Sequence, residues 1–112
     1  MSKDQLDTLE KFYPFYLSQH SNRINRKLHF IGTLGVILLA IHLILFNSYI
    51  NLYFIPFVGY GFAWVGHFFF EKNKPATFKY PVKSFLCDFI MFKRTLTSEI
   101  ESDYEQFRII QF

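Results

Sequence analysis

The sequence predicts an all-α integral membrane protein built on a transmembrane helical hairpin, and three observations support this prediction. Of the 112 residues, 51% are hydrophobic and 21% are aromatic, which is more apolar surface than a single soluble domain of this length easily buries. Two long stretches, 34–46 and 52–70, contain no Asp, Glu, Lys or Arg. The charged residues gather towards the ends of the chain and in the block 71–83.

The first predicted element is an amphipathic helix at 3–20. Its apolar side chains recur at helical spacing and share a face with His20, while charged side chains occupy the opposite face. Pro14 is expected to bend this helix or to break it in two. A helix of this kind lies on a membrane surface or caps a helical bundle.

Two transmembrane helices are predicted at 28–46 and 52–71. The apolar runs within them cover about 25 and 28 Å at 1.5 Å per residue, close to the thickness of the hydrocarbon core of a bilayer. A short uncharged turn joins them. Gly59 and Ala63 are four residues apart, and small side chains at that spacing let two membrane helices approach closely.

The basic residues set the expected orientation. All Lys and Arg that flank the hairpin precede its first helix or follow its second, so the positive-inside rule puts both termini in the cytoplasm. The membrane would be a bacterial inner membrane, or the endoplasmic reticulum in a eukaryote. Because these basic clusters adjoin apolar runs, they favour contact with the lipid bilayer over contact with nucleic acid.

Two further helices are predicted after the hairpin. The helix at 82–96 has one apolar face but is too short to span a bilayer, so it is expected at the interface or as a short membrane helix. The tail at 98–111 reads as an amphipathic helix that Ser98 and Glu101 would start with a capping box. All of 1–112 would then form a single membrane domain.

Three of the four histidines are expected at the cytoplasmic boundary. His67 and Glu71 are four residues apart, so on a continuous helix both project from one face and can share a metal, or the carboxylate can orient the imidazole. His29 would face them across the hairpin and His20 would close the site. Two or three His with one carboxylate and open positions suit ferrous iron and oxygen chemistry, and zinc accepts the same ligands. His42 lies deeper, where packing or a polar contact between helices is expected.

Three other residues bear on this site. Asn25 precedes His29 by one helical turn and would cap the first span or hydrogen-bond the site. Asp88 interrupts the apolar face of the third helix, where it either faces solvent or contacts the polar site. Cys87 is the only cysteine, which excludes a disulfide framework or a cysteine-based zinc site within one chain.

Two segments of the chain resemble the signature segments of a known family. They are FYPFYLSQHSNRINRKLHFIGT and GYGFAWVGHFFFEKNKPATFKYPVKSF, and the family of small membrane proteins that they resemble includes the fungal endoplasmic-reticulum 2-hydroxy fatty acid dioxygenase. The most telling matches are Gly66-His67, Glu71-Lys72 and Pro75-Ala76, together with the pairing of Asn25 and His29.

This resemblance implies an iron(II)-dependent dioxygenase of fatty acid α-oxidation, which uses O₂ to remove one carbon from a 2-hydroxy fatty acid. The family's functional histidines correspond to His20, His29 and His67, the expected ligands of Fe(II). The fungal protein has additional membrane sequence between the two segments, which this chain replaces with a short turn.

The chemistry of such a substrate agrees with the predicted position of the site. A 2-hydroxy carboxylate chelates iron through its hydroxyl and one carboxylate oxygen, which leaves a position for O₂. Its head lies at the membrane boundary, where basic side chains would hold the carboxylate, and Phe and Tyr of the hairpin would line the tail channel. These basic residues are Arg23, Arg26, Lys27 and Lys72.

Two other functions remain open from the sequence. One is a non-catalytic membrane protein whose hairpin associates with a partner through Gly59 and Ala63. The other is a zinc-dependent membrane hydrolase that uses the same ligands. Two membrane helices alone enclose a site only partly, which favours a homo-oligomer.

Overall fold

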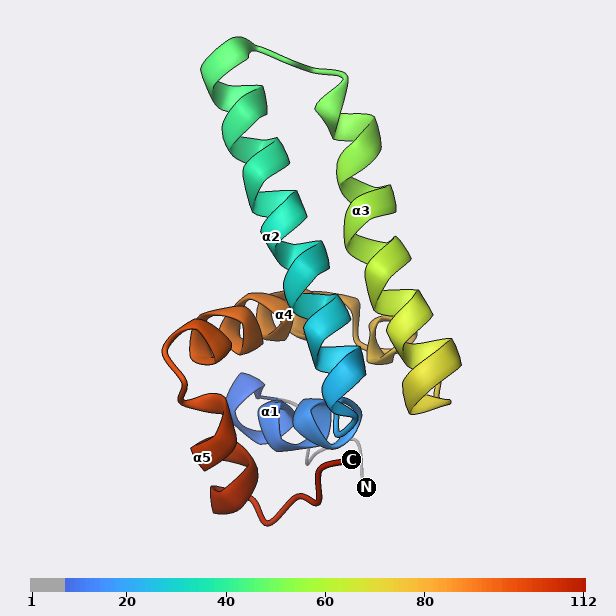
Figure 1. The fold of residues 1–112 in the computed structure, drawn as a ribbon, viewed down its shortest axis with the longest axis vertical. Helices are drawn as coiled ribbons and strands as arrows, with labels where there is room; N and C mark the ends of the chain where they lie inside the picture. The colour runs from blue at the N-terminus through green and yellow to red at the C-terminus, as the bar shows by residue number, and fades with distance from the viewer. Residues whose placement is uncertain (1–7) are drawn as a thin grey trace.

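A helical hairpin stands on a layer of shorter helices in the computed structural model, which describes residues 8–112 (Figure 1). The first short helix, α1 (Leu9–Ser18), starts at Thr8, whose hydroxyl accepts a hydrogen bond from the backbone of Lys11. It continues through Pro14 without a break. Residues 3–7 of the helix predicted at 3–20 lie outside the described residues.

The hairpin consists of α2 (Arg23–Phe46), then α3 (Asn51–Val65) and the π-helical segment η2 (Gly66–Glu71) that continues it. The side chain of Asn22 caps the start of α2, and Asn47 ends it in the left-handed conformation. Both helices of the hairpin are long and apolar enough to cross a membrane. The second agrees with the span predicted at 52–71 to within one residue, whereas α2 starts five residues before the span predicted at 28–46.

Small residues let the two helices of the hairpin pack closely. A Cβ added to Gly59 of α3 would come within 3.1 Å of a methyl group of Val36 on α2. This close approach fits the function predicted for Gly59 from its spacing. Farther along, Asn51 donates a hydrogen bond to Nδ1 of His42 at 3.0 Å. The polar contact predicted for His42 is therefore present, and it ties the two helices together near their turn.

The layer below the hairpin contains α4 (Pro81–Leu96), α5 (Ile100–Gln106) and a short 3₁₀ segment, η3 (Ala76–Phe78). In Figure 1, α4 crosses the base of the hairpin. Helices α1, α4 and α5 bury one apolar cluster between them, which fixes the layer as a unit. Its members are Phe12, Tyr16, Leu17, Cys87, Met91, Ile100 and Tyr104.

The tail differs from the helix predicted at 98–111. Ser98 has a positive φ of 62°, so the helix starts after it and no side chain caps its first turn. The predicted capping box is therefore absent. The helix ends at Gln106, and Phe112 then pairs with the loop before α2, accepting from Arg23 N at 3.0 Å and donating to Ser21 O at 2.9 Å. These long-range backbone hydrogen bonds replace the last turns of the predicted helix.

Candidate metal centre

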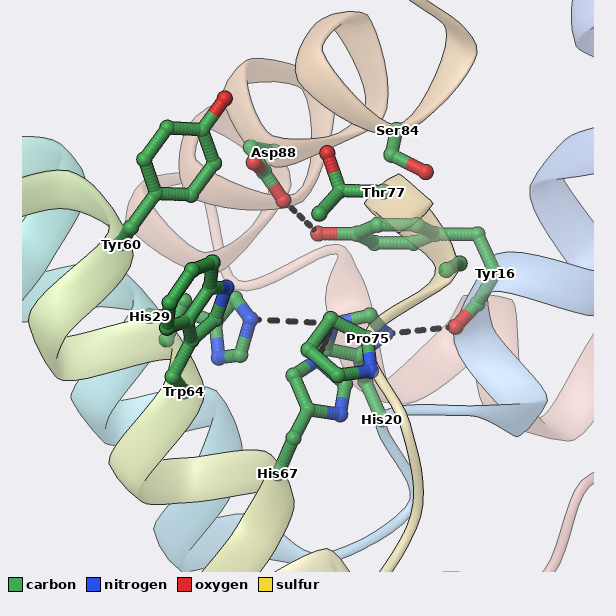
Figure 2. A pocket seen from close by; sticks show the side chains of 12 residues that line it. Tyr16, His20, His29, Tyr60, Trp64, His67, Pro75, Thr77, Ser84 and Asp88 are labelled. Atoms are coloured by element: carbon green, nitrogen blue, oxygen red, sulfur yellow. Dashed lines mark hydrogen bonds between the residues drawn. The ribbon is translucent and has the colours of Figure 1, made fainter. Parts of the chain in front are cut away.

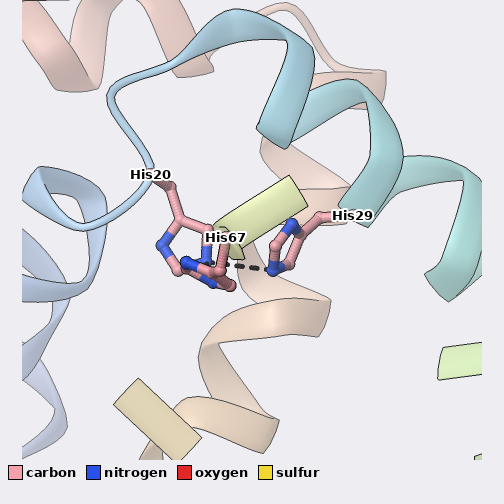
Figure 3. Close-up of side chains that lie close together, drawn as sticks. All are labelled: His20, His29 and His67. Atoms are coloured by element: carbon pink, nitrogen blue, oxygen red, sulfur yellow. Dashed lines mark hydrogen bonds between the residues drawn. The ribbon is translucent and has the colours of Figure 1, made fainter. Parts of the chain in front are cut away.

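The side chains of His20, His29 and His67 converge where the hairpin meets the layer of short helices (Figure 3). Nε2 of His20 lies 3.1 Å from Nε2 of His29 and 3.0 Å from Nε2 of His67. His20 is in the turn after α1, His29 is on α2 and His67 is on η2. All three are at least 95% buried. The structure thus brings together the three histidines that the sequence singled out.

The opposite nitrogen of each ring is held by an oxygen acceptor. Because a carbonyl oxygen only accepts, Nδ1 of each ring carries the proton and Nε2 keeps its lone pair. The acceptors are Tyr16 O for His20 at 2.7 Å, Asn25 O for His29 at 2.9 Å, and Asn73 Oδ1 for His67 at 2.7 Å. Burial, with the neighbouring His29 and His67, also lowers the pKa of His20 well below its usual value, which favours the neutral ring.

Three lone pairs that face one another repel, and a cation at their meeting point removes that repulsion. In the two pairs that include His20 the nitrogens lie 3.1 and 3.0 Å apart, and the ligand atoms of the three residues all lie within 4.8 Å of one another. Imidazole nitrogens with a hydrogen-bonded Nδ1 are common ligands of iron and zinc. The three residues therefore fit a divalent transition-metal ion, whose identity the donor set leaves open.

The π-helical segment explains how His67 gains its partner. Lys72 ends η2 in the left-handed conformation, with a φ of 60°, and the chain turns back so that Asn73 N donates to His67 O at 3.0 Å. The amide group of Asn73 donates to Gln19 O at 3.1 Å, which leaves its oxygen for the ring of His67. A π-helical turn at a functional site is a recurring feature of proteins.

Glu71 lies outside the group of three histidines. Its two carboxylate oxygens accept from Ser21 Oγ at 3.0 Å, Asn22 N at 2.9 Å and Asn25 Nδ2 at 3.0 Å. Asn22 caps α2, so the carboxylate stands at the positive end of that helix, where a negative charge is favoured. Glu71 thereby joins η2 to the loop after His20 and to the first turn of α2.

A close contact between Gly66 and Asn25 joins the two helices beside the site. A Cβ added to Gly66 would collide with Oδ1 of Asn25 and lie 3.2 Å from its Cα. That oxygen is buried and has no hydrogen-bond partner of the usual kind among residues 8–112, so the Cα–H of Gly66 is the group that points at it. Asn25 thus contacts η2 through its side chain and holds His29 through its carbonyl.

The turn of His20 is held from its other side by Arg26 and Tyr104. The carbonyl of His20 accepts from Arg26 Nη1 at 2.8 Å and from the hydroxyl of Tyr104 at 2.7 Å. The guanidinium lies over the ring of Tyr104, 4.4 Å from its centre, and also donates to Gln111. Arg26 is buried and is occupied by these contacts, so it holds the site together.

A small pocket of about 20 Å³ opens beside the histidines (Figure 2). Tyr16 stacks on the ring of His20 with 4.0 Å between ring centres, and its hydroxyl donates to Asp88 across the pocket wall. Burial raises the pKa of Asp88 to about 6 and that of Tyr16 well above its usual value. Asp88 therefore contacts the polar site, the second of the two positions that the sequence left open.

Of the basic residues that the sequence placed near the substrate carboxylate, Arg26 adjoins the histidines, since it contacts His20 and lines a small pocket with His29 and Asp88. Arg23 and Lys27 are exposed and line a separate surface groove together with Arg26. Lys72 is exposed at the end of η2. The lining of the histidine pocket in the described chain includes no Lys or Arg, and its polar side chains other than the histidines come from Tyr16, Tyr60, Trp64, Thr77, Ser84 and Asp88.

Sequence reasoning missed Tyr16 and Asn73 as parts of the site. Tyr16 reads as one more apolar residue of an amphipathic face, although its spacing of four from His20 is a signal that the two stack. Asn73 gives no such signal, because its contact with His67 depends on the positive φ of Lys72.

A family model described as 2-hydroxy-palmitic acid dioxygenase Mpo1-like matches residues 6–100. The matched region includes the three histidines, Asn25, Glu71 and Asp88. Searches of curated proteins and of solved structures found no match.

Proposed function

The chain belongs to the Mpo1-like family of 2-hydroxy-palmitic acid dioxygenases, and from this premise we propose that it is an iron(II)-dependent dioxygenase that shortens 2-hydroxy fatty acids by one carbon. The proposal rests on one observation. The Nε2 atoms of the three histidines converge, while Nδ1 of each ring donates a hydrogen bond to an oxygen acceptor. Histidines placed only for their amphipathic character at a membrane surface have no reason to share one buried point.

His20, His29 and His67 would hold the metal ion. Ferrous iron bound there supplies sites for O₂ and for the hydroxyl and carboxylate of the substrate, and polarises the bond to be broken. The protein keeps the three rings in one tautomer through Tyr16 O, Asn25 O and Asn73 Oδ1. Glu71 acts as a positioning residue in this proposal, because it fixes Asn25 and the loop after His20.

The substrate head would occupy the pocket beside the histidines. The carboxylate of Asp88 faces this pocket and accepts from Tyr16, so it offers an acceptor for the substrate hydroxyl. Ser84 also lines the pocket, and its buried hydroxyl has no partner within the described chain. We propose that Arg23, Lys27 and Lys72 attract the anionic head of the substrate to this face of the protein, since their side chains are exposed.

We further propose that the hairpin crosses a lipid bilayer. Only 11% of the apolar stretch of each helix is buried, whereas an apolar core helix of a soluble protein is mostly covered. The side chains that face outward are large and apolar, among them Leu38, Ile44, Phe46 and Phe57. With the basic residues at the open end of the hairpin, the positive-inside rule favours a cytoplasmic position for both termini and for the metal site.

The test is the metal content and oxygen uptake of protein purified in detergent without air. We expect about one iron per chain by elemental analysis and oxygen consumption that depends on 2-hydroxypalmitate. His67→Ala should lose the metal while circular dichroism retains the helical signal. His42→Ala is the matched control, because His42 contacts Asn51 and not the site. Protein with no bound iron and no substrate-dependent oxygen uptake would contradict the proposal.

A zinc-dependent hydrolase is the second candidate, and one observation favours it. The converging group contains three histidines and no carboxylate, and three histidines with an open fourth position are a known catalytic zinc site. The same elemental analysis separates the two candidates. Zinc in the purified protein, with hydrolysis of a lipid ester and no oxygen uptake, would favour the hydrolase.

A further inference from the structure

A second pocket, of about 250 Å³, adjoins the histidine pocket and continues along the hairpin. We call it the hairpin groove. The two pockets share five lining residues, namely His29, Tyr60, Ala63, Thr77 and Asp88. From this shared end the lining of the groove reaches Val36 on α2 and Ile55 on α3, and α4 closes one side with Phe85 and Phe89.

The groove is polar at one end only. His29, Asp88 and the hydroxyl side chains lie at or near the end shared with the histidine pocket, while the far end has Val36, Ile55 and Pro56. A ligand that fits such a lining has a polar head and one unbranched apolar chain. The volume of about 250 Å³ lies just below the range of about 300–1,000 Å³ that is usual for small-molecule sites, as expected for a groove that takes only part of a long ligand.

The length of the groove follows from the helices that line it. Helix α2 rises about 10 Å from His29 to Val36, and α3 about 12 Å between Ile55 and Ala63. An extended chain advances about 1.2 Å per bond, so about eight to ten carbons span the groove. Both helices of the hairpin continue beyond its far end, and there their large apolar side chains face outward.

We propose that the hairpin groove binds only the head-proximal half of a long acyl chain, about eight to ten carbons, and that the remaining carbons lie against the outer surface of the hairpin in lipid. This inference rests on the proposed function for the identity of the head. It makes the protein selective for chain length up to the far end of the groove and tolerant of any greater length. Ile55 is the residue that marks the limit.

Position-specific photolabelling measures this length directly and needs no turnover. The probes are 2-hydroxypalmitate with a diazirine either in the first half of the chain or at the terminal carbon, added to protein in lipid nanodiscs. We expect the first probe to label peptides of α2, α3 and α4 that line the groove, and the second to label lipid and the outward-facing residues of the hairpin instead. Equal labelling of the groove lining by the two probes would overturn the proposed length, and no labelling of the groove by either would overturn the site.

A pair of variants on α3 tests the limit residue. Ile55→Trp fills the far end of the groove, and overpacking of this kind costs enough to lower binding of long chains by about tenfold or more while short chains are unaffected. Phe57→Trp is the control, because Phe57 is 78% exposed and does not line the groove. An unchanged chain-length profile in Ile55→Trp would contradict the inference.

The outcomes separate this inference from the proposed function. Groove labelling by the first probe without oxygen uptake on any 2-hydroxy acid would leave the groove intact and refute the dioxygenase. Oxygen uptake on long chains without groove labelling would support the dioxygenase and refute binding in the groove.

Discussion

Gly66→Ala is a small substitution that should disturb the metal site from within the hairpin. The added Cβ would collide with Oδ1 of Asn25 and lie 3.2 Å from its Cα. Because one of these neighbours is backbone, rotation of a side chain cannot relieve the contact, and η2 must move away from α2. Overpacking of a tight interface costs about 1–3 kcal/mol, and displaced supporting groups lower metal affinity by about 10–100-fold.

The assay combines thermal denaturation in detergent with competition for the metal by a chelator of known affinity. Gly61→Ala is the matched control on α3, the helix that η2 continues, since a Cβ there has nothing within 4 Å. Replacing glycine by alanine in an open helical position should stabilise the protein by about 0.5–1 kcal/mol. Gly66→Ala with wild-type stability and metal affinity would refute the reasoning that this contact sets the separation of His29 and His67.

Three further substitutions test the supporting groups. Asn73→Ala removes the acceptor of the His67 ring and should weaken metal binding by about 10–100-fold, measured by chelator competition; unchanged affinity would contradict the role given to Asn73. Glu71→Gln should lower the free energy of unfolding by about 1–3 kcal/mol, because three donors lose a charged acceptor, while the metal stays bound; loss of the metal with full stability would make Glu71 a ligand instead. Burial raises the pKa of Asp88 from 3.8 to about 6, so the folded metal-free protein binds a proton that the unfolded chain releases, and stability should fall by about 3 kcal/mol between about pH 4 and 6. Asp88→Asn should remove that slope in unfolding curves, and a slope that persists would assign it to another group.

The hairpin could be predicted from the sequence because its signal is local and strong. Two uncharged apolar runs of sufficient length, joined by a short turn, allow few other folds. The first and last residues of the helices in the layer below the hairpin were harder to predict. The last helix of the layer ends at Gln106, and the backbone of Phe112 pairs with residues 21 and 23. Hydrogen bonds between backbone groups about ninety positions apart cannot be recognised from the local spacing of apolar residues. The same holds for Ser98, whose positive φ overrides a capping pattern.

The group of three histidines could be predicted from the sequence, but the side chains around it could not. His20, His29 and His67 stood out because each was placed at one predicted boundary. The spacing of His67 and Glu71 suggested that the carboxylate would join them, but Glu71 is the last residue of η2 and meets the start of α2 instead. Which residue accepts from each Nδ1 depends on tertiary geometry, and two of the three acceptors are backbone carbonyls that sequence patterns do not distinguish.

The charge of the site gives a physical reason for an acidic substrate. Three neutral imidazoles leave the charge of a divalent ion uncompensated, and an uncompensated charge in a buried place is costly. Glu71 does not offset it, because its oxygens are engaged with Ser21, Asn22 and Asn25. Asp88 lines the pocket, but it lies outside the group of side chains close enough to hold the ion, and its carboxylate is hydrogen-bonded to Tyr16. A ligand that brings its own negative charge, with a second oxygen beside it, completes the site better than an ester or an alcohol, and a 2-hydroxy acid has both groups.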